Sequence, residues 1–154
     1  MTAKADLLAS IRAELRARLE RLSNAARDAH AAATDAGSKA ESKYDTRNLE
    51  ASYLAKGQAR QVEEIAEQVR IFETWAPPAF EIDAPIDAGA LVEVDQEGET
   101  VFFLLAPAAG GLTLPHLDGE VTLLTPESPL YQKLVGLQVG DSGVAPEMTV
   151  TEVC

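Results

Sequence analysis

The chain has 154 residues, which is enough for one ordinary domain or two small modules and excludes a large multidomain enzyme. With 46% hydrophobic and 25% charged residues it has the composition of a folded protein, despite a formal net charge of -12. Its single cysteine, Cys154, excludes an internal disulfide and a cysteine-rich zinc cluster, so a reducing compartment fits best. No apolar run approaches the roughly 18 residues that a membrane span needs, so we expect a cytoplasmic protein.

The charge divides the chain into two halves. Residues 1–76 carry twelve basic and twelve acidic residues, whereas residues 77–154 carry thirteen acids and a single base, Lys133. All eight prolines and eight of the ten glycines also lie in the second half. Because the pair Pro77–Pro78 ends a helix and forces an extended connection, we predict a helical domain over 1–76, a linker over 77–80 and a second domain over 81–154.

Two helices are predicted in the first domain. Residues that are apolar, except for Gln58, recur there at steps of three and four in two stripes: Leu8, Ile11, Leu15, Leu19, Leu22 and Ala26, then Leu54, Gln58, Val62, Ile65, Val69 and Phe72. Each stripe is narrow and needs a partner, so the two helices are expected to form an antiparallel hairpin or coiled coil. We place its tip near residues 35–46, with the turn at Gly37–Ser38 and a capping box from Ser38 to Glu41 that starts the second helix.

The second domain alternates between apolar and polar residues, as strands do. Strands are predicted over residues 90–95, 100–105, 120–124 and 148–153, which together would form a small antiparallel sheet. One short helix is expected from Ser128 to Val135, with Ser128 as N-cap, Pro129 at its first position and Gly136 as terminator. The fold class is therefore α+β, a helical hairpin followed by a small antiparallel β domain with one short helix.

Most kinds of independent chemistry lack a signature in this sequence. His30 and His116 are in different domains, and neither has the spacing of a zinc ligand. No glycine-rich phosphate loop and no local nucleophile–base pattern is present. The acidic second half repels phosphate, so direct DNA binding is not expected and any role with nucleic acid would pass through another protein.

The hairpin tip offers one functional reading. Glu41 and Asp45 are four residues apart and share a helix face, and Asp35 lies beside the turn. A projecting carboxylate could complete a magnesium site that belongs to a partner. The alternative is structural: Glu41 serves the capping box, and Asp45 pairs with Lys43 or Arg47 on a solvated face.

Two stretches resemble the Gre-type bacterial transcription elongation factors (GreA/GreB family). Residues 38–45, Ser-Lys-Ala-Glu-Ser-Lys-Tyr-Asp, followed by Leu-Glu-Ala-Ser-Tyr-Leu-Ala at 49–55, are similar to the family's acidic tip and descending helix. Residues 125–130, Thr-Pro-Glu-Ser-Pro-Leu, then Leu-Val-Gly at 134–136 and Val-Gly-Asp at 139–141, are similar to its C-terminal pattern. With the architecture, these motifs cover nearly the whole chain.

The resemblance implies a fold, a partner and a mechanism. The C-terminal domain would have an FKBP-like fold and bind RNA polymerase, here through Ser128, Pro129, Leu130, Gly136 and Asp141, and the hairpin would enter the secondary channel. Tip acids would then help to hold the magnesium ion and water of the polymerase, with Glu41 as main ligand and Asp45 or Asp35 in support. The polymerase itself would cut backtracked RNA, so the chain would be an accessory factor and not an enzyme. It would have no cofactor of its own, meet the RNA 3′ end only inside the complex, and act as a monomer without DNA or membrane contact.

The chain departs from the family pattern at two positions. Ser38 stands where the family has an aspartate, and a hydroxyl is a weaker magnesium ligand than a carboxylate. Tyr131 replaces an expected glycine, and we interpret it as a core residue. Three readings follow: a cleavage-promoting factor, a channel-binding regulator or inhibitor without cleavage, and a prolyl isomerase or chaperone using the FKBP-like domain, which would need an aromatic-lined pocket.

Overall fold

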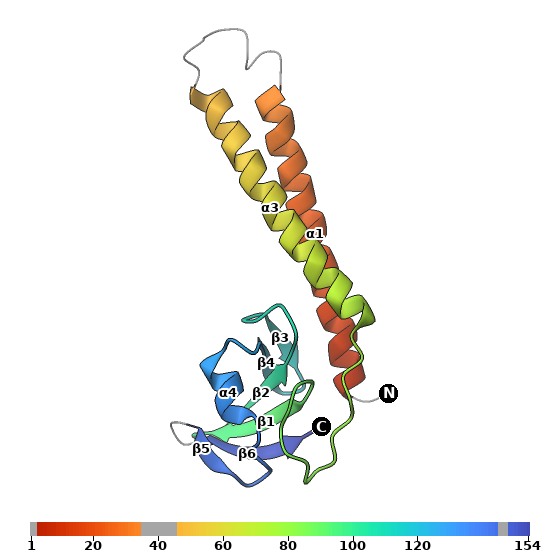
Figure 1. The fold of residues 1–154 in the computed structure, drawn as a ribbon, viewed down its shortest axis with the longest axis vertical. Coiled ribbons are helices and arrows are strands. Elements are labelled where there is room, and N and C mark those ends of the chain that lie inside the picture. Colours follow the sequence, from red (N-terminus) through yellow and green to blue (C-terminus); the bar gives the residue numbers. More distant parts are fainter. Residues whose placement is uncertain (1–2, 35–45, 145–147) are drawn as a thin grey trace. The chain divides into compact units, whose positions relative to one another are not determined.

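A computed structural model describes residues 3–34, 46–144 and 148–154, and side chains except those of residues 30, 32–55 and 144 within these ranges (Figure 1). Within these ranges two long helices come first and six strands follow, with one short helix between the fourth and fifth strands. Their bounds are α1 Ala3–Thr34, α3 Thr46–Thr74, β1 Leu91–Gln96, β2 Glu99–Leu105, β3 Thr113–His116, β4 Gly119–Leu124, α4 Pro129–Leu134, β5 Ser142–Val144 and β6 Met148–Val153. The predicted fold class is confirmed. In the part of the chain so described, no helix is long and apolar enough to cross a membrane.

The chain forms two compact units, which are considered separately. The helical unit is Arg12–Glu73, and the β unit combines the first turns of α1, through Ile11, with Thr74–Cys154. In the helical unit α1 and α3 run antiparallel and side by side (Figure 1). The second apolar stripe is oriented as predicted, because Phe72 is buried and Val62, Ile65 and Val69 are half-buried. The predicted turn at Gly37–Ser38 lies outside the described residues.

The β unit is built on a six-stranded sheet in the order β3-β4-β2-β1-β6-β5. The four predicted strands are present as β1, β2, β4 and β6. Four of the five strand pairs are antiparallel, as predicted, but β2 and β4 are parallel. The difference arises from β3, which was not predicted: the chain runs back along β3 at the sheet edge before β4 returns beside β2.

One face of the sheet packs on α4 and forms the main core. Buried strand residues include Val92, Val94, Phe103, Leu105 and Val150, and α4 adds Tyr131 and Leu134. At about 25 cal/mol per Å² of buried apolar surface, burial of this cluster stabilises the unit. Tyr131 is a core residue, as we interpreted it.

The first turn of α1 is attached to the β unit through one lysine. Lys4 Nζ donates hydrogen bonds to the carbonyl oxygens of Pro78 at 2.9 Å and Cys154 at 2.8 Å. It also lies 5.1 Å from the centroid of the Phe80 ring. Burial lowers the pKa of Lys4, and the neighbouring Cys154 thiol partly opposes this shift. These contacts, rather than the apolar stripe alone, fix the start of α1 on its unit.

Candidate functional site

The predicted tip acids lie outside the described residues. Asp35, Ser38, Glu41 and Asp45 all fall within residues 35–45, so their roles stay predictions. Among the residues whose side chains the structure describes, no three His, Cys, Asp or Glu side chains gather so that they could hold a metal ion.

The segment 128–141 of the β unit contains all five predicted partner-binding residues. Ser128 is the N-cap of α4: its side-chain oxygen accepts from the backbone N–H of Tyr131 at 3.5 Å, and Pro129 follows at the start of the helix. Gly136 has φ +91 and donates its N–H to the Ile86 carbonyl at 2.8 Å. A side chain would be strained at this backbone conformation, so glycine is needed for the turn itself.

Asp141 closes the next turn. Its carboxylate accepts the backbone N–H of Gln138 at 2.8 Å, and its own N–H donates to the Gln138 carbonyl at 3.0 Å. Pro129, Gly136 and Asp141 are exposed, Ser128 is half-buried, and Leu130 packs against the core. The structure thus gives each of these residues a local role and leaves three of them accessible to a partner.

An exposed apolar surface beside this segment was not predicted from the sequence. Among described residues, four large hydrophobic side chains are exposed, and three of them are Ile82 at 69%, Val135 at 40% and Val139 at 38%. We call these three the apolar patch. They lie on two loops, residues 81–86 and 135–139, that are far apart in sequence but hydrogen-bonded to each other. The only sequence signal was an isoleucine between two acids, Glu81 and Asp83, just after a proline-rich linker.

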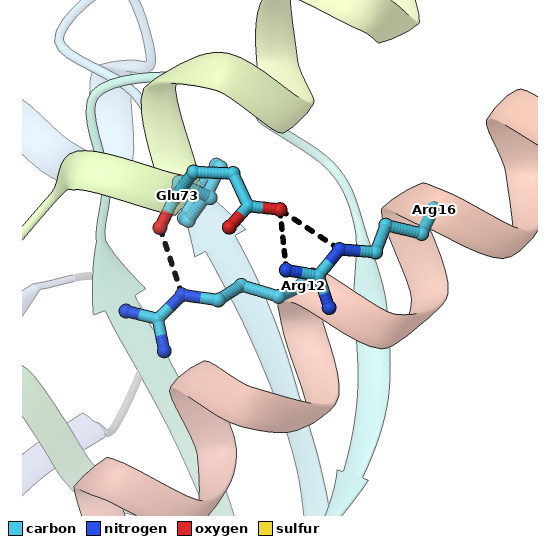
Figure 2. A network of polar contacts seen from close by, with 4 residues as sticks. Arg12, Arg16 and Glu73 are labelled. Carbon is cyan, nitrogen blue, oxygen red and sulfur yellow. Dashed lines mark hydrogen bonds and ion pairs between the residues drawn. The ribbon is translucent and has the colours of Figure 1, made fainter.

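The base of the helical unit is held by two arginines of α1 (Figure 2). Arg12 Nε donates to the Phe72 carbonyl at 2.8 Å, in the last turn of α3. Arg16 Nε donates to a carboxylate oxygen of Glu73 at 2.8 Å, and its terminal nitrogen Nη2 reaches the same oxygen. Arg12 thereby places a positive charge at the C-terminal end of α3, where the helix dipole favours one.

Comparison with known proteins gives similarity only at the level of solved structures. No protein-family model matches the chain, and no curated protein matches it. The crystal structure of GreA factor homolog 1 (Gfh1) of Thermus thermophilus is similar with 18% identity and a TM-score of 0.37, over 93% of this chain and 94% of that one. Gfh1 of Thermus aquaticus gives 19% identity and a TM-score of 0.33, over 98% and 94%. At these values the similarity does not by itself establish a family.

Proposed function

We propose that this chain is a transcription factor that binds bacterial RNA polymerase through its β unit and inserts its helical hairpin into the secondary channel. There it promotes magnesium-dependent cleavage of backtracked RNA by the polymerase. The proposal rests on the sequence motifs of residues 38–55 and 125–141 together with the confirmed fold class.

The observation that carries the proposal is a pair of long antiparallel helices joined to a small β domain. α1 has 32 residues and α3 has 29. At 1.5 Å per residue each helix is about 45 Å long. Two helices of this length have more surface than their contact with each other can bury. Such a hairpin is suited to inserting into another molecule, whereas an enzyme needs an enclosed site of its own.

The arm would supply one carboxylate ligand to a metal ion that the polymerase holds. A carboxylate at the tip, Glu41 with Asp45 or Asp35 in support, would add an oxygen to the magnesium ion of the polymerase and help to orient the attacking water. The polymerase holds the RNA and performs the hydrolysis. The chain itself is then an accessory factor without its own cofactor.

Ser38 favours a second candidate within the same class. With a hydroxyl where the family has an aspartate, the tip has one acid fewer, and the hairpin would occupy the channel without promoting cleavage. Such a protein would slow nucleotide addition and act as a regulator or inhibitor of transcription.

The test is RNA cleavage in a purified, backtracked polymerase complex with magnesium. We compare the wild type with Glu41→Ala, with Ser38→Asp, and with Glu63→Ala as a control, since Glu63 is an exposed acid on the α3 shaft. Cleavage that is lost only in Glu41→Ala supports the first candidate. Cleavage that requires Ser38→Asp, with slowed elongation by the wild type, supports the second, and no effect of any form on the polymerase refutes both.

A prolyl isomerase role is less well supported. It would need an aromatic-lined pocket, but Phe102, Phe103 and Tyr131 are buried and Phe80 packs against the core cluster. Peptide isomerisation by the full-length chain would revive this reading. The FKBP-like description of the β unit stays a prediction.

A further inference from the structure

Hydrogen bonds between the two loops hold the apolar patch in place. Gly136 N–H donates to the Ile86 carbonyl and Ile86 N–H to the Leu137 carbonyl, both at 2.8 Å, and Gln138 Nε2 donates to the Asp83 carbonyl at 2.7 Å. These bonds tie the loop of Ile82 to the loop of Val135 and Val139. A surface that is ordered before binding loses little conformational entropy when a partner covers it.

Unpaired acids accompany the patch. Glu81, Asp83, Asp87 and Asp141 are exposed and lie on the same two loops or at their ends. In the part of the chain that the structure describes, none of these four forms an ion pair with a base. In the helical unit, by contrast, three of the described acids form ion pairs, as in Arg16–Glu73, Arg18–Glu14 and Arg70–Glu67.

The charge decides what can cover the patch. Residues 77–154 contain thirteen acids against one base, so nucleic acid and anionic lipid are repelled, and so is the same surface of a second copy. A basic protein surface is attracted, and its apolar side chains would cover Ile82, Val135 and Val139. Charged rims of this kind steer encounter and fix the orientation of the partner.

We infer that the apolar patch, with Glu81, Asp83, Asp87 and Asp141 around it, is the docking surface for a protein segment that presents apolar side chains flanked by lysine or arginine. This inference rests on the proposed function, since RNA polymerase is the partner taken to supply the segment. It extends the predicted contact residues from segment 128–141 to the loop 81–86, which no motif identified.

The experiment measures the dissociation constant of the full-length chain for purified bacterial core RNA polymerase at several salt concentrations. The apolar test is Ile82→Ser with Val139→Ser. Its control is Leu117→Ser, because Leu117 is 71% exposed but lies in the β3–β4 turn, outside the patch. The charge test is Glu81→Lys with Asp83→Lys, which leaves the Asp83 carbonyl bond to Gln138 intact. Its control is Glu97→Lys with Glu99→Lys, two exposed acids at the β1–β2 turn.

We expect the patch variant to weaken binding about 10-fold or more, the Glu81/Asp83 variant to weaken it and reduce its salt dependence, and both controls to stay within about 2-fold. No form should unfold at a lower temperature than the wild type, so that weaker binding cannot be attributed to loss of the fold. If patch and control variants weaken binding equally, the inference is overturned while the proposed function stands. If the wild type does not bind polymerase, the proposed function is refuted, and so is the proposal that polymerase covers the apolar patch.

Discussion

Arg12 should contribute more to the stability of the helical unit than its neighbour Arg16, although both arginines connect α1 to the end of α3 (Figure 2). The proposed change is Arg12→Met, compared with Arg16→Met. Methionine keeps an unbranched apolar stem of similar reach and removes only the charged head, so the two variants differ in the polar contact that each loses.

The difference in magnitude follows from burial and from the acceptor. Arg12 donates to a carbonyl oxygen at 2.8 Å in a partly buried position, and hydrogen bonds from charged groups contribute about 1.5–3 kcal/mol. The side chains of Arg16 and Glu73 are 55% and 40% exposed, and ion pairs with such exposure contribute about 0–1 kcal/mol. We therefore expect a loss of about 2 kcal/mol for Arg12→Met and less than about 1 kcal/mol for Arg16→Met.

Urea unfolding followed by far-ultraviolet circular dichroism measures both losses, and the fluorescence of Trp75, the single tryptophan, reports on the residue after α3. Repeating the series at high salt adds a second readout, because the Arg16 contribution should fade and most of the Arg12 contribution should remain. Equal losses for the two variants, or a larger loss for Arg16→Met, would show that partial burial of the carbonyl contact is not what stabilises the base.

Three further predictions address single positions. Gln58→Leu should raise the stability of the helical unit by about 1 kcal/mol, because Gln58 Oε1 is buried and has no hydrogen-bond partner among the described residues. Urea unfolding should show no such gain for the exposed control Gln61→Leu. Ser128→Ala should lower the free energy of unfolding of the β unit by about 0.5–1 kcal/mol in urea unfolding. This value is in the lower part of the range for N-caps, because the hydrogen bond from Tyr131 N–H to Ser128 Oγ is 3.5 Å long. A loss above about 2 kcal/mol would contradict this interpretation. Burial lowers the pKa of His116, so the unfolded chain binds more protons than the folded chain as the pH falls below about 6.5. The free energy of unfolding should therefore fall as the pH drops through this range. The variant His116→Gln should show a weaker pH dependence.

The regular elements could be predicted because their patterns are local. Steps of three and four mark α1 and α3, alternation marks β1, β2, β4 and β6, and the Ser-Pro start with a glycine stop marks α4. The edge strands β3 and β5 have four and three residues, and they contain Pro115 and Gly143. Both residue types argue against a strand when the sequence is read alone, yet both are tolerated at a sheet edge. Because β3 was not predicted, the parallel pairing of β2 with β4 was not predicted either.

The candidate site was only partly predictable, for a different reason. Ser128, Gly136 and Asp141 have caps and turns as local signals, and the structure confirms those local roles. The apolar patch has no such signal, because the loop of Ile82 and the loop of Val135 and Val139 are joined by hydrogen bonds between segments some fifty residues apart in sequence. A surface assembled in this way can be found only once the fold is known.

The distribution of charge suggests why the two units differ. Ion pairs in the helical unit are solvent-exposed and add little stability, and residues 1–76 have no net charge because they contain twelve acids and twelve bases. The β unit instead retains thirteen acids against one base in residues 77–154, and this mutual repulsion disfavours its compact state. Folding gains nothing from that excess, but the docking surface that we infer would use it, and a large net charge also favours solubility. Salt should therefore act mainly on binding by the β unit and only weakly on the stability of the arm.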